Sequence, residues 1–243
     1  SRFKDLEVGK KLRDQLDKFS GEEQNEVVEI LCGRSSWADA LLDKIEQGQI
    51  SKSVLSPYHA SQIQALADLE LNRKLAEVWG VIRSTPAGLS KRKEELKEEL
   101  NTSHLANANL SEGRNLYQQQ CSNCHVLYGE GGKLGPDLTG SGRNNLDYLL
   151  ENIVDPNSVV SADYRMNVIE LLDGRVLSGM IAEQDRNSLT LRMPGSETVL
   201  RKSEIKKRQT LENSIMPAGL LDHLEPDQRR NLVAYLMHPF QVK

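Results

Sequence analysis

The sequence has little of several features that mark common classes of protein. Of its 243 residues, 5% are aromatic and three are cysteine, and no apolar run approaches the roughly 20 residues that cross a bilayer. The net charge of -4 gives no overall basic character of the kind that binds nucleic acid. Apolar residues still make up 38% of the chain, enough for a core, and the length suits two domains with a small third. We therefore expect several folded domains and no membrane span within this sequence.

Motifs of several enzyme classes are missing as well. No Ser/His/Asp set and no paired carboxylates are legible, so hydrolytic catalysis has no support. The glycine-rich segment 129–135 lacks the GxxxxGK[ST] pattern of a phosphate-binding loop. The chain begins Ser1-Arg2-Phe3-Lys4 without a signal-peptide pattern, which we interpret as the start of a processed or excised fragment.

The strongest motif is Cys121-Ser122-Asn123-Cys124-His125. Two thiols three residues apart, followed at once by a histidine, are the pattern of covalent c-type haem attachment. Each thiol would form a thioether with one haem vinyl group, and His125 would follow as an axial ligand of the iron. Bare C-x-x-C is shared with redox dithiols and zinc half-sites, but the second C-x-x-C or paired His cluster that zinc would need is absent from the sequence. Cys32 then has no partner for an internal disulfide and is expected to be a small buried side chain.

The other axial position needs a second ligand, for which Met216 is the best candidate. It lies in the loop 214–219, which contains Pro217 and precedes the last helix. The alternative is that Met216 is a flexible core filler. Weaker candidates are His104 and His223, then His59 and His238, which are remote or terminal, and Met166, Met180, Met193 and Met237.

Residues 1–104 have the periodicity of successive amphipathic helices. The apolar stripes are formed by Leu6, Leu12, Leu16 and Phe19 near the start, and by Leu71, Leu75, Val78 and Ile82 further on. Trp37 and Trp79 are expected in the core, and the charged stretch 91–100 is expected to be a solvated helix face. No clean repeat period is present, but a stack of helical hairpins is the best interpretation of this domain, which shows no chemistry of its own.

Residues 105–163 and 208–243 are interpreted as one discontinuous domain around the C-x-x-C-H motif. A helix from Ser111 runs into Cys121, a glycine-rich loop follows, residues 143–154 form a second helix, and a last helix starts at Glu225-Pro226. His125 and Met216 are 91 residues apart, and leaving out the 44 residues 164–207 brings them to 47, a suitable length for enclosing one haem.

Residues 164–207 are predicted to form a small inserted β-barrel. Five short β-rich runs are punctuated by Asp173-Gly174 and Pro194-Gly195, which favour tight turns. The run 168–179 resembles the opening hairpin of Sm-type barrels. A basic cluster lies at the end of this region: Arg201, Lys202, Lys206, Lys207 and Arg208. Without interleaved aromatics this cluster does not favour nucleic acid. It is either a solvated strand edge or a docking patch for an acidic redox partner.

The motifs carry a resemblance to class I c-type cytochromes over residues 110–163 and 208–243. More narrowly, GEGGKLGPDLTGSGRNNLDYLLENIVDP, DGRVLSG and IMPAGLLDHL are similar to the haem-binding domain family of planctomycetes and verrucomicrobia. Proteins of that family are large and exported, and the domain is commonly their C-terminal module, in some cases beside dehydrogenase parts. The resemblance implies a periplasmic or otherwise exported location, a Pro136 carbonyl that accepts a hydrogen bond from His125, and an Arg143 that reaches a haem propionate.

The sequence thus predicts a mainly α protein with a β insertion that carries one covalent haem c. His125/Met216 ligation would make it an electron-transfer domain, served by a dehydrogenase module or a partner protein, rather than a self-contained enzyme. If Met216 is displaced from the iron, the vacant position would suit a gas sensor or a peroxidase-like site. If no haem is bound, the chain would be a non-redox interaction module built from a helical stack and an Sm-like barrel.

Overall fold

The computed structural model describes residues 2–19, 21–140 and 142–242. Ser1 and the side chain of Leu6, both part of the sequence-based expectations, lie outside this description. By its internal contacts the chain divides into two compact units, residues 1–82 and 83–243. Ten α-helices are found in the described residues, together with antiparallel sheets. None of these helices is both long and apolar enough to cross a membrane.

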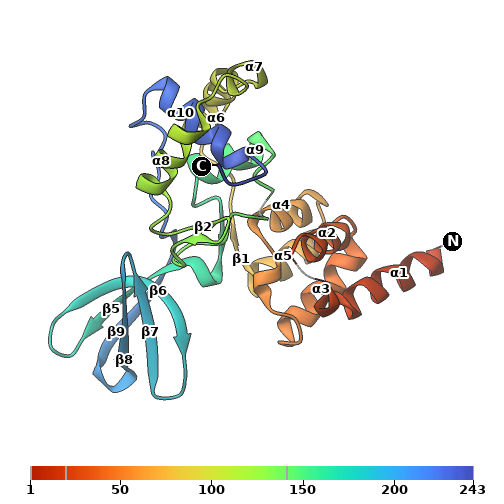
Figure 1. Ribbon diagram of the computed structural model, residues 1–243. Helices are drawn as coiled ribbons and strands as arrows, with labels where there is room; N and C mark the ends of the chain where they lie inside the picture. The colour runs from red at the N-terminus through yellow and green to blue at the C-terminus, as the bar shows by residue number, and fades with distance from the viewer. Residues whose placement is uncertain (1, 20, 141, 243) are drawn as a thin grey trace. The chain divides into compact units, whose positions relative to one another are not determined.

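Unit 1 (residues 1–82) is helical, as its periodicity predicts. Its elements are α1 (Arg2–Asp14), η1 (Leu16–Lys18), α2 (Gly21–Cys32), α3 (Ser35–Glu46), η2 (Lys52–Val54), α4 (Pro57–Ala65), α5 (Leu69–Val78) and the short β1 (Gly80–Ile82), drawn from red to orange in Figure 1. Ser56 caps α4, because its side chain accepts from the backbone N–H of His59 at the start of the helix. The N-cap of α3 is Arg34, and Ser35 is already helical.

The core of unit 1 is built from the predicted stripes. Trp79 is fully buried and donates its indole N–H to Leu55 O at 2.9 Å, and Trp37 is buried as well. Cys32 is completely buried, which confirms its prediction as a small apolar side chain. Burial raises the pKa of its thiol to about 12, so the group is neutral and unreactive at physiological pH.

Unit 2 (residues 83–243) begins with two helices that the sequence pattern had placed with the N-terminal domain. Its helices are α6 (Ala87–Glu99), α7 (Thr102–Leu105), α8 (Leu110–Gln120), α9 (Leu146–Val154) and α10 (Pro226–Met237). Leu96 and Leu100 of the α6 end are fully buried in the core that α8, α9 and α10 share. Salt bridges at the helix surface reinforce this attachment, among them Lys97 to Asp147 at 2.7 Å and Arg229 to Glu99 at 2.8 Å. The stretch 91–100 therefore has the expected solvated face of charged residues and, in addition, a buried face formed by Leu96 and Leu100.

The remaining elements of unit 2 are strands and short turns. Between α8 and α9 lie β2 (Val126–Leu127) and β3 (Glu130–Gly131), and after α9 come β4 (Val159–Ser161), η3 (Ala162–Tyr164), β5 (Arg165–Leu171), β6 (Val176–Gln184), β7 (Ser188–Met193), β8 (Ser196–Arg201), η4 (Lys202–Glu204) and β9 (Ile205–Ser214). The predicted turns are confirmed, since Gly174 and Gly195 both have positive φ, which glycine adopts without strain.

The strands β5 to β9 form one antiparallel sheet in the order β8-β7-β6-β5-β9 (Figure 1). Its apolar face consists of Ile169, Leu171, Leu189, Leu191 and Leu200. The expected barrel is not closed, because no pairing joins β8 to β9 in the described part of the chain and both remain edge strands. Strand β9 continues beyond residue 207, the predicted end of the insertion, and also beyond Gln209, where the β-rich run was expected to end; it reaches Ser214, two residues before Met216.

Candidate functional site

The C-x-x-C-H segment is a tight turn that follows directly on α8. Cys121 is the C-cap of the helix, and the backbone N–H groups of Cys124 and His125 both donate to Cys121 O, at 3.0 and 2.9 Å. The turn holds both thiols and the imidazole within five residues. Cys121 and Cys124 are free thiols and half-buried.

The electrostatics of the two thiols differ from those of a redox dithiol. Burial raises the pKa of Cys121 to about 12, and it also raises the pKa of Cys124 above its ordinary value. Redox-active C-x-x-C motifs instead lower the pKa of the attacking thiol, because the thiolate is the nucleophile. The site therefore does not have the environment of a disulfide-exchange centre.

His125 is fixed at its ring and at its backbone. The ring Nδ1 lies 2.8 Å from Pro136 O, and the hydroxyl of Tyr117 donates to His125 O at 2.7 Å. Burial lowers the pKa of the imidazole, against a smaller opposing effect of the Pro136 hydrogen bond. The neutral ring must carry its proton on Nδ1 to donate to a carbonyl, which leaves the lone pair on Nε2 for a metal.

The glycine-rich loop 129–135 packs against this turn where no side chain could fit. A Cβ on Gly132 would lie 2.1 Å from Asn123 O, and a Cβ on Gly135 would lie 2.5 Å from Cε1 of His125. The loop is also hydrogen-bonded to the turn, since Gly132 N donates to Ser122 O and Gly135 N to Cys124 O, each at 2.7 Å. The glycines thus allow the backbone to lie directly against the cysteines and the imidazole.

Met216 lies in unit 2 between β9 and α10. Its side chain is partly buried and packs against the same apolar core as Cys121 and Tyr128. Its backbone N–H donates to the Ser214 hydroxyl at 3.1 Å. The alternatives lie in other settings: His104 and His223 are exposed, Met180 is buried in the sheet, and His59 belongs to unit 1. Met237, on α10, is the only other methionine placed against that core in the described residues.

Arg143 is buried and tied to the C-terminal end of α10. Its guanidinium donates to Leu236 O at 2.7 Å, to His238 O and to Thr139 O, and it lies over the ring of Tyr128 at 4.9 Å. These contacts connect the segment before α9 to the C-terminal end of α10. The propionate contact implied by the family resemblance stays a prediction.

Two tyrosines of the site were not singled out from the sequence. Tyr117 precedes Cys121 by four residues, about one helical turn, which places both on one side of the helix. This spacing could have indicated that Tyr117 belongs to the site. Tyr128 has a φ of +53°, unusual for an aromatic residue, and its hydroxyl donates to His238 O. Nothing in the local sequence indicates that backbone conformation.

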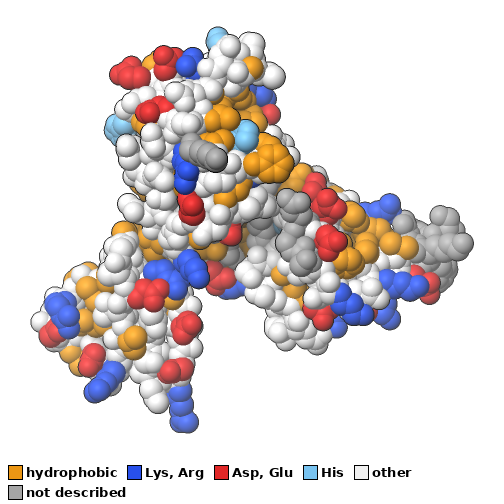
Figure 2. Space-filling model, viewed as in Figure 1, with side chains coloured by type: hydrophobic (Ala, Val, Ile, Leu, Met, Phe, Trp, Pro, Cys, Tyr) orange, Lys and Arg blue, Asp and Glu red, His pale blue; other side chains and the backbone are white. Residues whose placement is uncertain are grey.

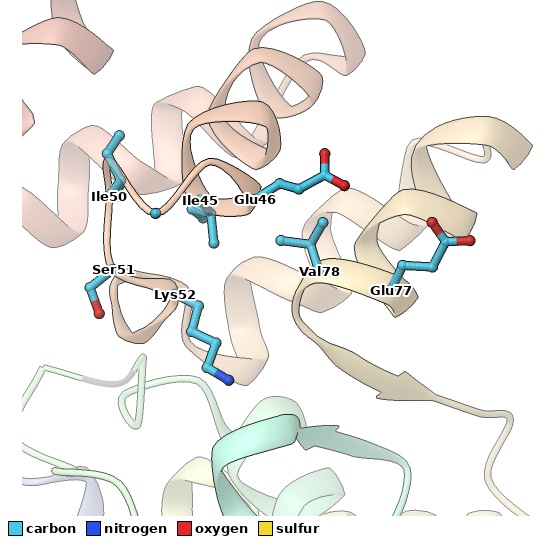
Figure 3. A pocket seen from close by; sticks show the side chains of 8 residues that line it. Ile45, Glu46, Ile50, Ser51, Lys52, Glu77 and Val78 are labelled. Carbon is cyan, nitrogen blue, oxygen red and sulfur yellow. The ribbon is translucent and has the colours of Figure 1, made fainter. Parts of the chain in front are cut away.

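A groove of about 460 Å³ lies in unit 1, away from the C-x-x-C-H turn in the chain. Its lining includes the apolar Ile45, Ile50 and Val78, with the carboxylates of Glu46 and Glu77 at one end and the Lys52 side chain at the other (Figure 3). No group of three or more metal-ligating His, Cys, Asp or Glu side chains occurs in the residues described, in this groove or elsewhere.

The side chains of the C-x-x-C-H turn fit a covalent haem. Two neutral thiols, an imidazole with a free Nε2 lone pair, and a glycine loop lying flat against the turn are the groups that such an attachment requires. Residues 108–163 match the family model described as Cytochrome C oxidase, cbb3-type, subunit III. This segment is similar to a cytochrome c domain. A comparison with curated proteins finds no match.

The match supports the cytochrome c resemblance and, with it, haem binding and electron transfer as the general function. It includes both cysteines, His125, Pro136 and Arg143, but it ends before Met216. The narrower resemblance to the family of planctomycetes and verrucomicrobia is not tested by it.

Proposed function

We propose that residues 105–163 and 208–243 form a c-type cytochrome domain with one haem, attached through Cys121 and Cys124. The observation that carries the proposal is the hydrogen bond between His125 Nδ1 and Pro136 O, at 2.8 Å. Because this bond fixes the ring, Nε2 is held in a constant orientation as a ligand for iron. The carbonyl of Pro136 also increases the basicity of the ring, which strengthens a bond to iron.

Met216 is the proposed second axial ligand. Three arguments support it: it follows the sheet and precedes α10, it packs on the core that contacts Cys121, and its thioether is partly buried. A haem with His/Met ligation exchanges single electrons at a raised reduction potential. With both axial positions filled by side chains, no position remains for a substrate, so the domain transfers electrons and does not turn over a substrate.

The electron donor is proposed to be a dehydrogenase, either a partner protein or a module of a longer chain. Cytochrome c domains usually lie outside the cytoplasm, and we propose a periplasmic or otherwise exported location on that basis.

The inserted sheet is proposed to be Sm-like: the strand order β8-β7-β6-β5-β9 and the short η4 before β9 support this comparison. Figure 2 shows Lys and Arg interspersed with Asp and Glu on the sheet, which favours a solvated surface over a nucleic-acid patch.

The axial ligation is tested by the absorption spectrum of the haem-loaded protein and of Met216→Ala. We expect a low-spin c-type spectrum with a weak far-red sulfur-to-iron band that disappears in Met216→Ala, because the thioether is removed. Met237→Ala is the matched control, since Met237 packs on the same core and its loss should leave the band in place. A high-spin spectrum that Met216→Ala leaves unchanged would refute the ligation and favour the gas-binding or peroxidase-like alternative.

A further inference from the structure

The sheet of β5 to β9 is bonded to both segments that carry the proposed iron ligands. The sheet is inserted between His125 and Met216 in the sequence, but insertion alone does not require such bonds, because an inserted domain can be joined to the rest of the chain by its two ends only. In the structure, however, the sheet contacts the loop beside His125 through a side chain, and its last strand leads directly into the loop of Met216.

The first attachment is made by Arg192, near the end of strand β7. Its Nη1 donates to Lys133 O at 2.9 Å, while its Nε is paired with Glu197 on the neighbouring strand β8. Lys133 directly follows Gly132, whose N–H donates to Ser122 O at 2.7 Å within the C-x-x-C-H turn. Arg192 thus holds the backbone of the glycine-rich loop that positions His125.

The second attachment is made where β9 ends. The N–H of Ser214 donates to Oδ1 of Asn157 at 2.7 Å, and the Ser214 hydroxyl accepts from Met216 N at 3.1 Å. Ser214 also pairs with Arg165 at the start of β5, beyond an irregularity in the ladder. Asn157 follows α9 of the haem-binding part, so this bond connects the end of the sheet to that part immediately before Met216.

We propose that Arg192 and Asn157 are positioning residues for the axial ligands, and that through them the sheet holds Met216 in reach of the iron. This inference rests on the proposed His125/Met216 ligation. A loop that is already ordered loses less conformational entropy when its side chain binds iron. The Asn157 bond orders the loop of Met216, and the Arg192 bond orders the loop that positions His125, so both hydrogen bonds favour the ligated state. Without either of them Met216 leaves the iron more often, and the ferrous state loses part of its stabilisation.

The test uses the haem-loaded chain of 243 residues and the binding of imidazole to its ferric form, which requires Met216 to leave the iron. We expect Arg192→Ala and Asn157→Ala each to increase the rate of imidazole binding about two- to tenfold, the effect of one lost hydrogen bond. Both variants should also weaken the far-red sulfur-to-iron band and lower the reduction potential. Arg175→Ala is the matched control, since Arg175 lies beside the β5–β6 turn and pairs with Asp173.

Conservative variants separate positioning from general loss of structure. Arg192→Lys and Asn157→Asp each retain a group of the required type, a donor to Lys133 O and an acceptor from Ser214 N, and should recover most of the wild-type rate. Asn157 lies outside the sheet, so its variant keeps the test decisive if Arg192→Ala unfolds the strands. Folded variants with wild-type imidazole kinetics and potential would overturn this inference alone, whereas a wild type without the far-red band would overturn the ligation on which it rests.

Discussion

Burial decides the protonation state of single histidines in this protein. His59 is completely buried in α4, where its Nδ1 accepts from Ser56 N at 3.2 Å as part of the helix cap, and its Nε2 has no hydrogen-bond partner. Desolvation lowers the pKa of His59 from 6.5 to about 4, although the nearby Glu29 opposes the shift. The ring is therefore neutral in the folded unit 1 well below the pH at which a free histidine takes up a proton.

This shift predicts that unit 1 loses stability at mildly acidic pH. Above pH 6.5 the ring is neutral in both the folded and the unfolded state. As the pH falls from 6.5 towards about 4, the unfolded state binds a proton that the folded state does not, so the free energy of unfolding decreases. The pKa difference of 6.5 minus about 4 corresponds to about 3 kcal/mol.

Urea unfolding followed by tryptophan fluorescence measures this effect, because Trp37 and Trp79 both lie in unit 1. We expect His59→Gln to remove most of the dependence on pH between 6.5 and 4. His104→Gln, at an exposed position of α7 in unit 2, is the control and should leave that dependence unchanged. If the free energy of unfolding depends on pH equally in His59→Gln and in the wild type, groups other than His59 cause the dependence.

Single residues of the site were predictable to different degrees. The spacing of Cys121, Cys124 and His125 is set by covalent chemistry and is therefore visible in the sequence. The need for glycine at positions 132 and 135 is not visible in the sequence. It arises because the fold brings the backbone of Asn123 and the ring of His125 within 3 Å of where a Cβ would lie. The contacts of Arg143 with the end of α10 join residues about 95 apart in the sequence, and no local pattern records them.

At the scale of elements, the crossing of α8 and α10 holds unit 2 together. Tyr117 and Tyr235 pack with ring centroids 5.8 Å apart, and Asn109 N donates to Oδ1 of Asn231 at 2.9 Å. At the contact, Gly113 has no side chain, and a Cβ there would lie 2.1 Å from Asn231 O. The two helices can approach this closely only because the residue is glycine. The crossing also places Tyr117 so that its hydroxyl reaches His125 O.

Replacing Gly113 should therefore separate the helices. We expect Gly113→Ala to destabilise unit 2 by about 1–3 kcal/mol, because the new methyl meets backbone rather than a flexible side chain. Thermal unfolding followed by circular dichroism in the far ultraviolet measures the loss. Gly88→Ala in α6 is the matched control: nothing lies within 4 Å of its Cβ, and alanine favours a helix, so it should be neutral or slightly stabilising. Equal effects of the two substitutions would contradict the close approach.

Elements were predicted better than their ends and partners. The strand runs and the Asp-Gly and Pro-Gly turns depend on local chemistry, and the structure has them where the sequence places them. The extension of β9 beyond residue 209 was not predicted, because polar residues such as Glu212 and Asn213 do not continue the apolar alternation, although they belong to an exposed edge strand. The packing of α6 on the core of unit 2 was not predicted, because the few apolar residues that α6 and its C-cap place there, Leu89, Leu96 and Leu100, do not reveal their partner.

For the whole molecule, the sequence predicts a helical domain, a haem domain and an insertion, and the contacts of the chain define two compact units. Unit 2 contains all the residues proposed to attach, ligate and position the haem. Unit 1 supplies none of them, and its groove lies between its own helices α3 and α5. The central proposal is thus a property of unit 2 and does not depend on the arrangement of the two units.

The most direct measurement is extraction of the purified protein, made with a haem-attachment system, with acidified acetone, followed by the mass of the intact chain. We predict that one haem stays on the wild-type chain and increases its mass by one haem. Cys121→Ser combined with Cys124→Ser should lose all haem to the solvent, while Cys32→Ser should retain it, since Cys32 is buried in unit 1. A wild-type chain that loses its haem, or never binds it, would contradict the cytochrome assignment and leave the non-redox interaction module as the better interpretation.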